Sequence, residues 1–118
     1  MTRLALPLLA IVALLAAAGC GSGGGGGKAT TLKSGDDIGM KSLRFKPDHV
    51  RVAVGQRITW RNDDSVGHDV KADSGAKFAS ATFGKDKTYS WTPTAAGTVK
   101  YECTLHPGMD GTIDVVAK

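Results

Sequence analysis

From residue 43 onward, apolar and polar positions alternate in several short stretches of the chain. Residues 49–54 place Val50, Val52 and Val54 on one face of an extended segment. Clusters of Asn, Asp, Pro and Gly separate this stretch from others like it. Short strands at regular spacing, with turns between them, predict an all-β sandwich of about seven strands. The same two-residue period recurs in residues 57–61, 87–91, 98–103 and 111–116.

The large aromatic residues of this region are candidates for the core. A domain of this size buries only a little over 60% of its unfolded surface, so a few bulky side chains must supply much of the packing. Residues 71–84 show no clear period, and no amphipathic helix of useful length is visible. We expect the core to be built mainly around Trp60, Trp91, Tyr101 and Phe83.

The first twenty residues differ in character from the rest. Arg3 precedes an apolar run over residues 4–18, and small residues lead to Cys20. This order predicts an export signal over residues 1–20. The run is interrupted by Pro7 and is shorter than the ~20 apolar residues of a membrane-spanning helix.

The sequence around Cys20 resembles a bacterial lipoprotein signal. Alanine and glycine precede Cys20, and glycine and serine follow it. The resemblance implies that Cys20 is lipidated and anchors the exported protein to the cell membrane, outside the cytoplasm. Ordinary cleavage near Ala18 is the alternative. A disulfide between Cys20 and Cys103 is disfavoured because it would consume the one thiol of the remaining chain.

The segment that follows the signal is polar and rich in glycine. Residues 21–42 include a glycine run and show no periodicity, which is typical of a flexible tether. The folded domain is then predicted to span residues 43–118.

The charge of the chain excludes one class of partner. The formal net charge is +4, and without Arg3 of the signal 14 basic and 11 acidic residues leave +3. No basic run or aromatic-interleaved patch is present, so nucleic-acid binding is not expected. The mild excess is compatible with a redox partner that has an acidic docking face.

A short segment near the carboxy terminus concentrates the chemistry. Cys103, His106 and Met109 follow one another at intervals of three residues, and Pro107 and Gly108 bend the chain so that they can converge. A soft thiolate, an imidazole and a weak thioether suit copper better than zinc, magnesium or iron. We therefore interpret this segment as a copper-binding loop.

Such a site needs a second imidazole from elsewhere in the chain. His49 lies on the face opposite Val50 and Val52, which is predicted to be solvent-exposed. His68 follows a turn cluster and is the better candidate. The whole chain contains three histidines.

These motifs resemble those of the cupredoxins, the small blue copper proteins. The likeness covers roughly residues 43–116 and rests on the spacing of Cys103, His106 and Met109 together with the upstream Gly67-His68-Asp69. The two-residue gap before the methionine is similar to the short loop of amicyanins, whereas plastocyanins and pseudoazurins have longer loops.

The resemblance implies a Greek-key β-sandwich of seven to eight strands that binds one type 1 copper ion. It implies His68, Cys103, His106 and Met109 as the copper ligands, with Met109 as the long axial ligand. Asp69 would hydrogen-bond near the cysteine loop, and the carbonyl of Gly67 occupies a position that approaches copper in azurins. The function implied is electron transfer by a monomer that exchanges electrons with redox proteins of unknown identity.

Several other functions compete with electron transfer. Three histidines and one loop cysteine cannot support a multicopper oxidase, a copper nitrite reductase or a binuclear copper centre. No nucleophile–base motif or phosphate-binding loop is present, so an enzyme is not expected. A lipoprotein that sequesters or delivers copper would use the same ligands and stays open, as does an immunoglobulin-like binding module without metal.

Overall fold

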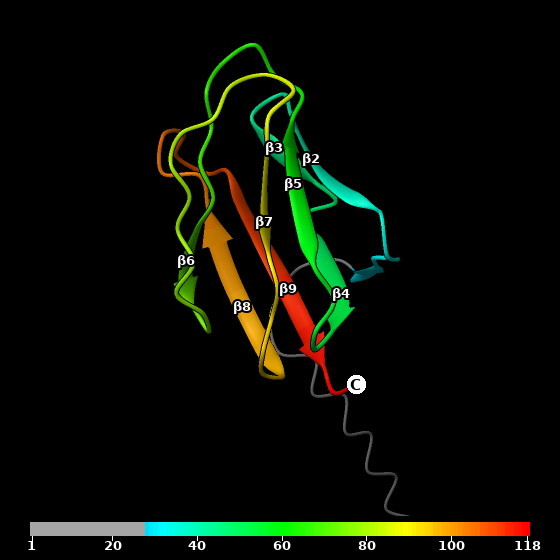
Figure 1. Ribbon diagram of the computed structural model, residues 1–118. Coiled ribbons are helices and arrows are strands. Elements are labelled where there is room, and N and C mark those ends of the chain that lie inside the picture. Colours follow the sequence, from blue (N-terminus) through cyan, green and yellow to red (C-terminus); the bar gives the residue numbers. More distant parts are fainter. Residues whose placement is uncertain (1–27) are drawn as a thin grey trace, which may run out of the picture.

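The computed structural model describes residues 28–118, which form nine β-strands in two facing sheets (Figure 1). The predicted signal, Cys20 and the glycine run of the tether lie outside the described residues. The larger sheet has the order β1 (Thr30–Thr31), β4 (His49–Ala53), β9 (Asp110–Val116), β8 (Gly97–Glu102) and β6 (Lys71–Ser74). The smaller sheet has the order β3 (Arg44–Lys46), β2 (Asp37–Lys41), β5 (Ile58–Asn62) and β7 (Thr88–Trp91).

The topology confirms the predicted all-β sandwich, with nine strands instead of seven or eight. Parallel pairing joins β4 to β9 and β2 to β5, while β8 and β9 form an antiparallel hairpin. Strands distant in sequence therefore lie side by side in each sheet. Within residues 28–118, the structure contains no helix with the length and apolarity needed to cross a membrane.

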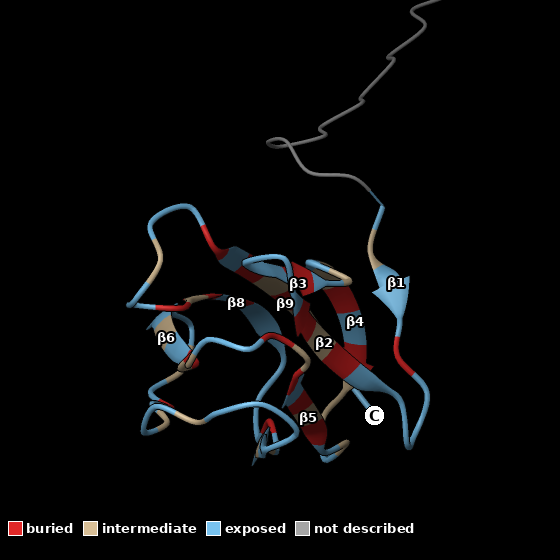
Figure 2. Ribbon diagram, turned by 90° about the horizontal axis from the view of Figure 1, so that it is seen from above, coloured by how far each residue is buried: buried red, intermediate tan, exposed pale blue. Residues whose placement is uncertain are grey.

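The two-residue period of the sequence is the burial pattern of the strands. Val50 and Val52 of β4 are buried, and the residues between and beside them are half-buried or exposed (Figure 2). Successive side chains of a strand point to opposite faces, so one set of each strand fills the space between the sheets. The same holds for the inward residues of the other predicted strands, Ile58, Trp60, Val99, Tyr101, Ile113 and Val115.

The aromatic core differs in part from the prediction. Trp60 and Tyr101 are buried, and their ring centroids lie 5.4 Å apart in an edge-to-face arrangement. Trp91 and Phe83 are only partly buried because they lie at the edge of the packed core. The remaining buried rings belong to two phenylalanines that the sequence pattern did not single out, Phe45 and Phe78.

The predicted domain boundary at residue 43 is too late. Strands β1 and β2 lie inside the segment 21–42, which we expected to be a tether. Leu32 is buried and its N–H donates to the carbonyl of Arg51 at 3.0 Å, and Ile38 and Met40 have no exposed surface. Only alternate residues of this segment face the core, so its average composition is polar although it belongs to the fold.

The sandwich brings two loops together at one end (Figure 1). One is the segment that follows β5, and the other connects β8 to β9 and carries Cys103, His106 and Met109. His68 pairs with Phe83 in an isolated β-bridge just beyond β5. The strand ends therefore set the separation of these two loops.

Replacing Ile38 tests whether residues 30–42 belong to the domain. Ile38→Ala removes a fully buried side chain, and we expect the free energy of unfolding of the metal-free domain to fall by about 2–5 kcal/mol. The matched change Val116→Ala, at an exposed position, should cost about 0.5 kcal/mol or less. Equal, small losses in chemical denaturation would show that the segment is not part of the fold.

Candidate metal centre

The loop between β8 and β9 closes on itself. Val99, Tyr101 and Cys103 are buried in alternation, so Cys103 continues the inward register of β8. The N–H of Cys103 donates to the carbonyl of Met109 at 2.9 Å, and the N–H of Met109 donates to the carbonyl of His106 at 3.1 Å. These bonds bring the two ends of the loop together, with Met109 buried at its base.

One glycine makes this closure possible. Gly108 has a φ of +85°, a left-handed backbone conformation that residues other than glycine adopt only with strain. Gly108 lies between Pro107 and Met109, at the point where the chain turns back toward β9. The turn chemistry noted in the sequence therefore has the structural role expected of it.

His68 reaches the same place from the other loop. Two backbone hydrogen bonds with Phe83, of 3.1 and 2.8 Å, hold the segment that carries it. The imidazole has no exposed surface, and its Nδ1 lies 3.6 Å from the Sγ of Cys103. Residues 35 apart in sequence thus place a sulfur and a nitrogen in contact.

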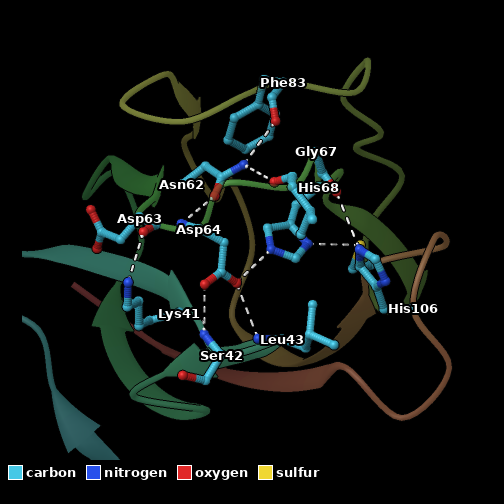
Figure 3. A network of polar contacts seen from close by, with 12 residues as sticks. Lys41, Ser42, Leu43, Asn62, Asp63, Asp64, Gly67, His68, Phe83 and His106 are labelled. Atoms are coloured by element: carbon cyan, nitrogen blue, oxygen red, sulfur yellow. Dashed lines mark hydrogen bonds and ion pairs between the residues drawn. The ribbon is translucent and has the colours of Figure 1, made fainter.

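Three potential metal ligands converge in this interior. One donor atom from each of His68, Cys103 and His106 lies within 4.8 Å of the others. The two imidazole rings pack edge to face, with centroids 4.8 Å apart. The Nε2 of His106 also lies 3.2 Å from the carbonyl oxygen of Gly67, which places that carbonyl beside the cluster (Figure 3).

The donor set fits copper. Two imidazole nitrogens and a buried thiol, beside a buried thioether residue, are the components of mononuclear blue copper sites. His49 does not join the cluster; its Nε2 lies 2.8 Å from a carboxylate oxygen of Asp114, between β4 and β9. The structure thus brings His68, and not His49, to the cysteine loop.

A buried carboxylate contacts the far side of His68. The Oδ2 of Asp64 lies 2.9 Å from the Nε2 of His68, and the N–H groups of Ser42 and Leu43 donate to the same carboxylate at 2.8 and 3.1 Å (Figure 3). Burial of Asp64 favours its neutral form, but the hydrogen bonds from Leu43, His68 and Ser42 outweigh this effect and lower its pKa to about 2. The carboxylate is therefore ionised at neutral pH.

Asn62 shapes the loop that carries both Asp64 and His68. Its side-chain oxygen accepts from the N–H of Asp64 at 2.8 Å, and its amide donates to the carbonyls of Val66 and Phe83 at 2.8 and 3.0 Å. The side chain is fully buried with all of these bonds made. It fixes the path of the chain from the end of β5 to His68.

Asp69 links the two loops directly. One carboxylate oxygen accepts from the N–H of Thr104 at 2.6 Å, and the other accepts from the hydroxyl of Thr104 at 2.5 Å. These are the contacts near the cysteine loop that the resemblance implied. They join the residue after His68 to the residue after Cys103.

The sequence pattern did not single out Asp64 or Asn62 as residues of the site. Both lie in a cluster of turn-forming residues, where Asn and Asp are common for local reasons. The available signal was the spacing, because Asp64 precedes His68 by four residues and a carboxylate near a ligating histidine often orients its ring.

Comparison with known proteins agrees with this geometry. The family model described as copper binding proteins of the plastocyanin/azurin family matches residues 31–116. Amicyanin from Paracoccus denitrificans is 33% identical over 82 residues, covering 66% of this chain and 63% of that protein, and so less than two thirds of its length. Plastocyanin from Scenedesmus fuscus is 36% identical over 98 residues, covering 72% of this chain and 97% of that protein.

Solved structures show the same likeness. The structure of a reduced amicyanin mutant superimposes with a TM-score of 0.66 at 28% identity, covering 72% of this chain and 85% of that chain. A structure of another amicyanin mutant, in the reduced Cu(I) form at pH 4, gives a TM-score of 0.63 at 29% identity, covering 77% and 85%.

The link between Asp69 and Thr104 can be tested through metal affinity. Asp69→Ala leaves the N–H and hydroxyl of Thr104 without their acceptor and frees the two loops, so we expect Cu(II) affinity to fall about 10–100-fold. Thr104→Val removes only the hydroxyl bond and should have a smaller effect. Competition titrations with a Cu(II) chelator measure both. Unchanged affinity in Asp69→Ala would mean that the link does not support the site.

Proposed function

Because this chain belongs to the plastocyanin/azurin family of copper-binding proteins, we propose that it carries single electrons with one type 1 copper ion held by His68, Cys103, His106 and Met109. The observation that carries the proposal is the convergence of a thiol and two imidazoles from two loops in a buried space. When bound, copper supplies a one-electron couple between Cu(II) and Cu(I).

The residues of the chain suit this role because the donor groups are held by other contacts. Cys103 and Met109 are tied by the backbone bonds of their loop, and His68 is held by Phe83 and Asp64. Groups fixed in this way need little rearrangement when the charge at their centre changes by one. All the proposed ligands come from the protein, which leaves no position for a substrate, as expected of an electron carrier and not of a catalytic metal site.

The end of the domain near His106 suits contact with a redox partner. His106 is partly exposed, unlike Cys103 and His68. Leu105, in the same loop, and Leu43 and Val66, in the neighbouring turns, are large apolar residues that are more than 40% exposed. We infer that a partner redox protein docks against these residues and that electrons pass through the edge of the His106 ring.

The location of the protein rests on its sequence. The lipoprotein-like signal over residues 1–20 and the glycine-rich segment after it support an exported domain attached to the cell membrane through lipid on Cys20. Strand β1 begins at Thr30, so the tether in this proposal is limited to roughly residues 21–29.

The metal site is tested by visible spectroscopy. Cu(II) added to the metal-free protein should produce an intense blue thiolate-to-copper band at one equivalent, because Cys103 supplies the single thiol of the described domain. Cys103→Ser should abolish the band, and His68→Asn should abolish or strongly shift it. His49→Asn is the matched control and should leave it unchanged, since His49 lies by Asp114.

A colourless copper complex would contradict the proposal. Reversible reduction and reoxidation without loss of metal is the expected behaviour in voltammetry. Rapid loss of Cu(I) to a chelator on reduction would instead support copper sequestration or delivery.

Membrane attachment is tested by substituting the proposed lipidation site. In bacterial cells that process lipoproteins, the chain without substitutions should be found in the membrane fraction. Cys20→Ser should move the protein to the soluble extracytoplasmic fraction. Cys103→Ser controls for loss of a cysteine and should stay with the membrane. Soluble protein in all three cases would show ordinary cleavage of the signal.

A further inference from the structure

Asp64 connects His68 to the turn between β2 and β3. Its carboxylate contacts the Nε2 of His68 on one side and the N–H groups of Ser42 and Leu43 on the other. These contacts do not involve the other edge of the His68 ring, where Nδ1 lies 3.6 Å from the Sγ of Cys103. Asp64 therefore contacts a proposed ligand, His68, on the side of the ring away from Cys103.

The turn adopts an unusual conformation to make these bonds. Lys41 pairs with Arg44, so Ser42 and Leu43 form a two-residue hairpin loop. Both have positive φ, of 54° and 59°, in a conformation for which hairpins normally use Asn-Gly. Leu43 is strained there, and such strain persists only where surrounding contacts impose it. The hydrogen bonds that the N–H groups of Ser42 and Leu43 donate to Asp64 are contacts of this kind.

The carboxylate of Asp64 is directed at the ring of His68. Its side chain is only 12% exposed, and among residues 28–118 its only ion-pair partner is His68. The neighbouring Asp63 behaves differently: its side chain is 42% exposed and pairs with Arg61. Asp63 and Asp64 therefore offer two carboxylates, adjacent in sequence, of which one contacts the site.

Both carboxylate oxygens of Asp64 accept from backbone N–H groups, of Ser42 and Leu43, and a carboxylate that acts only as an acceptor requires the Nε2 of His68 to donate to it. When the ring carries one proton, that proton is therefore on Nε2, and the lone pair of Nδ1 faces Cys103. A negative charge on the far side of the ring also makes Nδ1 a stronger donor, as carboxylates do for ligating histidines. Cu(II), with the higher charge, gains more from this than Cu(I).

We propose that Asp64, held by the strained Ser42–Leu43 turn, is a positioning residue that sets the tautomer of His68 and lowers the reduction potential of the centre. This inference rests on the proposed copper site. In this inference, Asp64 changes the relative affinity of the site for Cu(II) and Cu(I), and does not only stabilise the fold.

The potential of copper-loaded Asp64→Asn tests the proposal, with Asp63→Asn as the control that removes the same formal charge beside it. We expect Asp64→Asn to lower the ratio of Cu(II) to Cu(I) affinity about tenfold or more, which raises the potential by about 59 mV for one electron. Asp63→Asn should shift it far less, and Asp64→Glu, which keeps the charge, should stay closer to the unsubstituted protein. Equal shifts in the two asparagine variants would overturn the proposal.

The tautomer of His68 gives a readout that needs no copper and no variant. In the metal-free protein, at a pH where the His68 ring carries one proton, ¹⁵N NMR of the histidine rings should show that proton on Nε2. A proton on Nδ1 would overturn the proposal even if Asp64→Asn failed to fold. A reversible copper wave in the unsubstituted protein would leave the proposed function standing in either case.

Discussion

Two loops from different parts of a small sandwich must be held against each other for this protein to have a metal site. The contact is made by Asp69, which accepts two hydrogen bonds from Thr104, and by His68, whose ring lies against the sulfur of Cys103. Each loop is anchored by its own strands, so the loops are positioned by the pairing within the sheets. The proposed ligands are therefore arranged by the strand pairing and by the contacts between the loops.

The polar groups beneath the site form one connected set. Asn62 fixes the backbone of Asp64, Asp64 orients His68, and the turn after β2 supplies the hydrogen bonds that keep the carboxylate ionised. Buried polar groups of this kind are costly unless all their partners are present, and here the partners come from three segments of the chain.

Much of the fold and site followed from local patterns. Alternating valines and isoleucines marked β4, β5, β8 and β9, because burial of every second residue is a property of each strand by itself. The spacing of Cys103, His106 and Met109 indicated a copper loop, and the pattern around His49 argued against that residue. Strand β2 was missed because it includes Gly39, a residue type uncommon in strands, and because one of its two partners, β5, is distant in sequence.

By itself, then, the sequence determined which segments could be strands, which residues had copper chemistry and which histidine was the better partner. The tertiary structure decided where the domain begins, which phenylalanines complete the core and which carboxylate reaches His68. These depend on pairings between segments about twenty or more residues apart, such as Asp64 with the turn at Ser42. The periodicity of a strand shows which of its side chains are buried, because that depends on the strand alone. Which residues those side chains contact depends on how the two sheets pack.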